Sequence, residues 1–156
     1  MDVEIVPVPL TEKPLLWARF QDYAQELTQY GTHARVNGEF EYPYFDLYWT
    51  EPDRFPFWAV ADGKRVAFAL VHRMAHETEM AEFYSFPEAR RSGAALKFAQ
   101  AILERFPGRW ELTQYRANDG AVAFWRRVIG DRPYTEDAYT GDSGRARLRQ
   151  RFVVAA

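Results

Sequence analysis

The segment from Glu77 to Tyr115 constrains the fold more than any other part of the sequence. A strand pattern, ETEMAEFYSF, stops at Pro87, an amphipathic helix begins at Gly93, and a second strand pattern, RWELTQY, follows that helix. A strand, a crossover helix and a second strand form a unit in which the two strands run parallel. We therefore predict an α/β sheet with a parallel pair at this point, and we expect ligands at the carboxyl ends of its strands.

The rest of the chain supplies five further strand patterns and two further helix patterns. The Asp62-Gly63 dipeptide between two apolar runs is a strong hairpin signal. No internal repeat, low-complexity tract or linker divides the sequence, so we expect one domain over residues 1–156. The predicted strands are 3–8, 55–61, 64–73, 134–141 and 145–154, and the predicted helices are 11–30 and 118–130.

Composition excludes several classes of function. The chain has no cysteine, so a thiolate nucleophile or a cysteine metal site is excluded. A net charge of −2 indicates no nucleic-acid partner, and no apolar run approaches the roughly eighteen residues of a membrane span. His33, His72 and His76 are spaced poorly for metal binding, so no metal site is expected. The expected protein is soluble, with the cytoplasm as the default compartment.

The loop between the strand and the helix, PEARRSGAAL, has the features of an anion site. Main-chain N–H groups in the first turn of a helix lack internal partners, and Gly93 and Ala95 leave space for a ligand beside them. Arg90 and Arg91 add positive charge. On these residues alone an alternative is equally good: Ser92 or Gly93 caps the helix and both arginines are solvated.

A resemblance to a known family favours the anion site. The residues RRSGAA (90–95) match the Gln/Arg-x-x-Gly-x-Gly/Ala pattern of the GNAT acetyltransferase superfamily, and WELTQYRANDGAVAFWRRVIG resembles its fifth strand and following helix. The N-terminal third carries no recognisable motif. The resemblance implies a mixed, mostly antiparallel sheet of about seven strands with helices on both faces.

The resemblance also implies an activity. Members of the family generally transfer the acetyl group of acetyl-CoA directly to an amine, so a small-molecule or peptide amine is the expected acceptor and acetyl-CoA the co-substrate. Two alternatives stay open: a non-catalytic CoA-binding or sensor domain, and an aromatic-rich binding module that uses the fold without CoA. An open groove between the strands at 77–86 and 109–115 distinguishes them, because a binding module that does not use CoA does not require it.

The family pattern assigns binding roles to particular residues. Main-chain N–H groups of the loop would hold the pyrophosphate, and the main chain near Ser85 and Phe86 would pair with the pantetheine arm as if it were an added strand. Asn118 either reaches the pantetheine or only caps its helix, and both roles can hold. The residues assigned to acetyl-CoA are Ser85, Phe86, Arg90, Arg91, Ser92, Gly93, Ala95, Asn118 and Trp125.

The acid and base of the reaction are assigned from strand position. Some relatives carry a glutamate where Glu82 lies, which makes it the candidate base; a solvated strand carboxylate is the alternative. Alternation puts Glu82, Tyr84 and Phe86 on one face until a bulge intervenes. Many relatives have a tyrosine acid where this chain has Trp125, so Tyr115, Tyr84 or water is expected to replace it, or the thiolate leaves unprotonated.

Three features outside these motifs remain to be explained. The aromatic segment 32–53 has no clear period and is expected to be a loop that forms a wall of the substrate site. Four arginines alternate along RARLRQRF, which favours a solvated face that discourages edge association, with an acidic substrate or partner as the alternative. A homodimer is also left open. The four arginines of RARLRQRF are Arg145, Arg147, Arg149 and Arg151.

Overall fold

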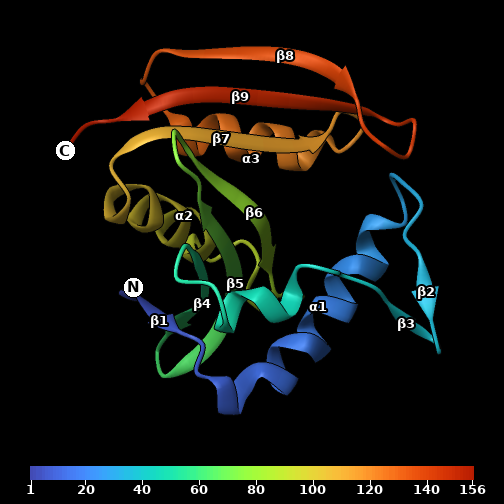
Figure 1. The fold of residues 1–156 in the computed structure, drawn as a ribbon. Coiled ribbons are helices and arrows are strands. Elements are labelled where there is room, and N and C mark those ends of the chain that lie inside the picture. Colours follow the sequence, from blue (N-terminus) through green and yellow to red (C-terminus); the bar gives the residue numbers. More distant parts are fainter.

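Seven strands form one mixed sheet in the computed structural model, which describes residues 1–156. Their spatial order is β1-β4-β5-β6-β7-β9-β8, and only the β6–β7 pair is parallel (Figure 1). The predicted sheet and its parallel pair are therefore confirmed. The strands are β1 (Val3–Pro7), β4 (Arg54–Ala61), β5 (Lys64–Arg73), β6 (Thr78–Ser85), β7 (Gly108–Tyr115), β8 (Tyr134–Thr140) and β9 (Ala146–Val154).

Helices cover both faces of the sheet, as expected. The α2 (Ala94–Arg105) and α3 (Asp119–Ile129) helices pack on one face, and α1 (Lys13–Leu27) packs on the other (Figure 1). Each face has its own buried cluster, because the strand residues alternate between the two sides. Phe98 and Trp110 are fully buried on the α2–α3 side. None of the helices has both the length and the apolar character needed to cross a bilayer.

The start and end of α1 differ from the prediction. A short 3₁₀ turn, η1 (Leu10–Glu12), precedes the helix, which therefore begins at Lys13 and not at residue 11, and Glu12 occupies the N-cap without a side-chain hydrogen bond. Pro14 fits in the first turn because its missing N–H has no intrahelical partner there. The helix ends at Leu27, before the predicted stop at Gly31.

The segment 32–53 is more regular than the loop expected from its sequence. It contains a hairpin, β2 (Arg35–Val36) and β3 (Glu39–Phe40), and a 3₁₀ helix, η2 (Phe45–Trp49). Asn37 and Gly38 connect the two strands with φ angles of 53° and 82°, which two-residue hairpin turns require. The Asn37-Gly38 pair is a hairpin signal in the sequence, and the prediction missed it because the segment was judged by its aromatic composition. Phe40, Phe45 and Tyr48 bury this segment against α1 and the sheet.

A gap opens between β6 and β7. The two strands pair only at Thr78–Trp110 and Glu79–Glu111, and beyond these residues they diverge. A bulge in β6, where the β5 register shifts between Leu70 and Val71, turns the later residues of the strand. Met80 packs on the α2 side, whereas Tyr84 and Phe86 pack on the α1 side. The sheet is therefore open at the carboxyl end of the parallel pair.

Candidate active site

The loop that joins β6 to α2 carries free main-chain donors. The N–H groups of Arg91, Ser92, Gly93 and Ala95 make no hydrogen bond within the chain. Arg91 and Gly93 have φ angles of 67° and 83°, and a Cβ built on Gly93 would meet no atom within 4 Å. Gly93 is the N-cap of α2, and the hydroxyl of Ser92 just before it accepts the N–H of Ala94 at 3.3 Å, while the neighbouring N–H groups remain free for an anion.

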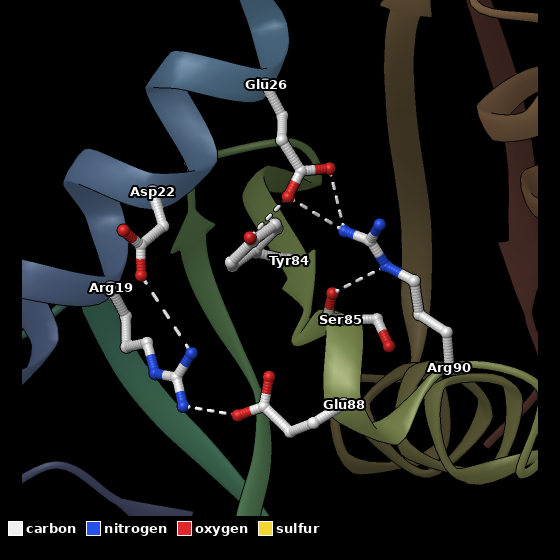
Figure 2. Close-up of polar contacts among 7 residues, drawn as sticks. All are labelled: Arg19, Asp22, Glu26, Tyr84, Ser85, Glu88 and Arg90. Carbon is white, nitrogen blue, oxygen red and sulfur yellow. Dashed lines mark hydrogen bonds and ion pairs between the residues drawn. The ribbon is translucent and has the colours of Figure 1, made fainter.

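The first arginine of this loop binds α1 instead of facing the free donors. Figure 2 shows the Arg90 guanidinium donating to both oxygens of Glu26, at 2.8 and 3.0 Å, and to the carbonyl of Ser85 at 3.1 Å. The Tyr84 hydroxyl donates to the same Glu26 carboxylate. Arg90 thus fixes the loop to α1, and its charge is neutralised there.

A second contact between α1 and the loop lies beside the first. Arg19 donates to Glu88 at 2.5 Å and lies 3.9 Å from Asp22 (Figure 2). Its guanidinium also stacks 3.8 Å from the centroid of the Phe86 ring. The Phe86 N–H bonds to the Val66 carbonyl on β5 at 2.9 Å, so it points away from the gap. Strand alternation therefore turns the main chain of Ser85, and not that of Phe86, toward the gap.

A cavity of about 720 Å³ runs through the gap from one face of the sheet to the other. Tyr23 and Tyr42 line it on the α1 side, Glu82 and Tyr115 lie on the two diverging strands, and Trp125 lines it on the α3 side. The open groove is the feature that a CoA-free binding module does not require. The segment 32–53 contributes a wall of this cavity, as expected. The strands are also separated near Ser85, as expected.

Glu82 lines the cavity and is hydrogen-bonded to α1. The Tyr23 hydroxyl donates to its Oε1 at 2.7 Å. Burial raises the pKa of Glu82 from 4.5 to about 7, although hydrogen bonds from Tyr23 and Tyr42 and the charge of Arg147 act in the opposite direction. A carboxyl with this pKa can take up a proton at neutral pH. In the sequence, Tyr23 is one of the apolar residues spaced along the predicted helix 11–30, a pattern typical of core residues, so nothing marked it as a partner of Glu82.

The two tyrosines proposed as acids occupy different places. The Tyr115 hydroxyl lines the cavity and lies 3.2 Å from Nε2 of His33. Burial and then the nearby Arg147 charge lower the pKa of His33, which favours a neutral imidazole. Tyr84 does not line the cavity, and its hydroxyl is engaged by Glu26. Gly31 leaves space for the Tyr115 side chain, because a Cβ at this position would lie 2.5 Å from the Tyr115 hydroxyl oxygen.

Comparison with known proteins identifies the family. A family model described as "Acetyltransferase (GNAT) family" matches residues 17–130. The chain belongs to this family. No curated protein sequence matches the chain, so its similarity to solved structures is the remaining comparison.

Solved GNAT structures share the fold at low sequence identity. An acetyltransferase from Streptococcus agalactiae is 13% identical with a TM-score of 0.75, covering 99% of this chain and 96% of that one. The ribosomal-protein-S18-alanine N-acetyltransferase of Escherichia coli is 17% identical with a TM-score of 0.64 over the same shares. A mutant spermidine N-acetyltransferase from Vibrio cholerae is 11% identical with a TM-score of 0.68, covering 98% of this chain and 95% of that one.

This GNAT protein departs from the family's motif on the α3 side of the cavity. Trp125 packs edge-on against Phe83, with ring centroids 4.9 Å apart, and forms an apolar wall at the position where the sequence resemblance implied a tyrosine. The Asn118 side chain accepts the N–H of Ala121 at 3.1 Å, so it caps α3, and it also lines the cavity. No three His, Asp or Glu side chains gather as a set of metal ligands.

Proposed function

We propose that this GNAT protein is an N-acetyltransferase that moves the acetyl group of acetyl-CoA directly to a primary amine of a small molecule or peptide. The observation that carries the proposal is the position of Glu82. Its carboxyl group, with a pKa of about 7, lies in the cavity that runs through the β6–β7 gap. The free donors of the 91–95 loop lie next to the carboxyl end of β6, which opens onto the same gap.

The free donors of the loop and the gap between the strands support acetyl-CoA as the co-substrate. The free N–H groups of Arg91, Ser92, Gly93 and Ala95 would hold the diphosphate, and the exposed strand edge at Ser85 would flank the pantetheine arm. When bound, acetyl-CoA supplies an activated acetyl group. The proposal gives Arg90 a positioning role, because its guanidinium is bound to Glu26.

The proton balance assigns one role to each of two cavity residues. Glu82 accepts the proton of the amine as the new N–C bond forms and the C–S bond breaks. Tyr115 donates a proton to the departing thiolate, and the hydrogen-bonded His33 orients its hydroxyl. Tyr84 is left out of this scheme because its hydroxyl binds Glu26 outside the cavity.

A thiol-release assay with acetyl-CoA tests the function. The panel contains amines, amino acids, polyamines and peptides, and mass spectrometry identifies any acetylated product. A non-catalytic CoA-binding domain is the second candidate, because Trp125 replaces the usual tyrosine. Binding of acetyl-CoA without turnover of any acceptor supports that candidate, whereas failure to bind acetyl-CoA contradicts both.

Replacing Tyr115 with phenylalanine is expected to lower kcat by about 10²-fold at most, the low end of the range for acid–base catalysis. The effect is limited because a thiolate with a pKa of about 8.5 can leave unprotonated. Steady-state kinetics measure it, with Tyr134→Phe on the exposed face of β8 as the control. An unchanged kcat in Tyr115→Phe rules out Tyr115 as the acid.

A further inference from the structure

Arg147 of β9 extends into the cavity and is held there by three neighbours. Its Nη2 donates to the Thr113 hydroxyl at 3.3 Å, and its guanidinium carbon lies 4.5 Å from the centroid of the Tyr115 ring. The aliphatic stem packs on Gly141, where a Cβ would lie 2.9 Å from Cδ of Arg147. The guanidinium is therefore positioned before any ligand arrives.

Arg147 has no carboxylate partner, unlike the two arginines that follow it on the same face of β9. Arg149 pairs with Asp137 at 2.7 Å, and Arg151 pairs with Glu111 at 3.3 Å. The other arginine of the cavity, Arg54, pairs with Glu51 at 2.9 Å. The predicted role of a solvated arginine face that discourages edge association is wrong, because β9 lies between β7 and β8 and both Arg149 and Arg151 are ion-paired. Arg147 instead presents an unpaired, half-buried charge to the cavity.

The charge of Arg147 reaches the groups that carry out the proposed chemistry. Burial has the largest effect on each group: it raises the pKa of Glu82 and of Tyr23 and lowers the pKa of His33. The positive charge of Arg147 acts to lower the pKa of all three. A group bound to Arg147 would therefore lie near the amine that Glu82 deprotonates.

The carboxylates of the cavity leave room for a ligand anion at this point. Glu111 pairs with Arg151, and Glu79 lies 3.4 Å from Nδ1 of His72. Apart from Glu82 itself, the other acidic side chains of the lining are Glu41 and Asp142, which are exposed at the surface. No carboxylate of the protein forms an ion pair with Arg147, so an anion beside it would meet an unpaired cation, with Glu82 as the cavity carboxylate on which the charge of Arg147 also acts.

We propose that Arg147 binds a carboxylate of the acceptor, which makes the acceptor an amino acid whose amine faces Glu82. This inference rests on the proposed N-acetyltransferase function and names its substrate class. A guanidinium suits the task because its planar array of N–H groups matches a carboxylate in two-pronged geometry. A polyamine, which carries no anion, would leave Arg147 unpaired and facing another positive charge.

Matched acceptors test the inference. Each amino acid is compared with its amide and with the amine that lacks the carboxyl group, using thiol release from acetyl-CoA. We expect at least about tenfold higher kcat/KM for the carboxylate form, and a fall of about 10- to 10²-fold for that form in Arg147→Met, the range for a hydrogen bond to a charged group. Arg149→Met, on the same strand and face, is expected to retain the preference, because Asp137 already occupies its guanidinium.

The outcomes separate this inference from the proposed function. Turnover of amines without a preference for the carboxylate, or an equal loss for all acceptors in Arg147→Met, overturns the inference and leaves the function intact. If no amine is turned over, calorimetric titration of N-acetylglycine in the presence of CoA decides the question. Binding that is lost only in Arg147→Met supports the inference, and absent or equal binding in wild type, Arg147→Met and Arg149→Met overturns it. Thermal unfolding checks that each variant is folded.

Discussion

Replacing Glu82 with glutamine is expected to lower kcat/KM for amine acetylation by about 10²- to 10⁴-fold, the usual contribution of a general base. Glutamine retains the size of the side chain and can still accept the Tyr23 hydroxyl, so the change removes the proton acceptor alone. Glu104→Gln, on the exposed side of α2, is the matched control. Wild-type turnover by Glu82→Gln would exclude Glu82 as the base.

The pH profile adds a second readout for the same residue. Only the deprotonated carboxylate can accept a proton, so the wild-type kcat/KM should rise through a pH of about 7, the pKa of Glu82, and level off above it. The folded protein holds this proton more tightly than the unfolded chain, so Glu82 lowers stability as the pH rises from 4.5 to about 7. Glu82→Gln should lack that rise in rate and should be at least as stable as wild type above pH 7. Loss of activity with retained stability then identifies a chemical role.

Replacing Gly93 with glutamate is expected to weaken acetyl-CoA binding by about 10²-fold or more. The new carboxylate would lie beside donors that bind an anion, and the φ angle of 83° is strained for any residue with a Cβ, which costs about 1–2 kcal/mol. Isothermal titration calorimetry with acetyl-CoA measures the loss.

Gly63 offers a matched control for that substitution. It has a φ angle of 75° in the β4–β5 hairpin, and a Cβ on it also meets no atom within 4 Å. Gly63→Glu thus introduces the same strain and charge away from the loop, and it should bind acetyl-CoA as wild type does. Equal affinities for Gly93→Glu and Gly63→Glu would contradict a diphosphate site at residues 91–95.

The sheet and the loop could be predicted because their signals are local. The apolar alternation of β4 and β5, the Asp62-Gly63 turn and the stop at Pro87 each lie within a few residues of the structure they specify. The same is true of the Asn118 cap, which acts on Ala121. Such patterns need no knowledge of how distant segments meet.

The parts of the site that escaped prediction depend on distant partners. Glu26 reads as a solvent-facing residue of an amphipathic helix, yet it binds Arg90, which is 64 positions away in the chain. Tyr23 reads as core, yet its hydroxyl reaches Glu82 across 59 positions. Arg147 and Arg149 are equivalent in the strand pattern and differ only because Asp137 on β8 faces one of them. Tertiary placement decides these roles.

The short pairing between β6 and β7 has a consequence for motion. Main-chain contact between the β1-β4-β5-β6 half of the sheet and the β7-β9-β8 half is limited to two residue pairs, so the halves can open locally with little loss of hydrogen bonding. A ligand that bonds to both edges would link them, and by mass action it would suppress this opening. Acetyl-CoA is therefore expected to slow amide hydrogen exchange at Ser85 and along the facing edge of β7 together, whereas exchange in the β4–β5 hairpin should stay unchanged.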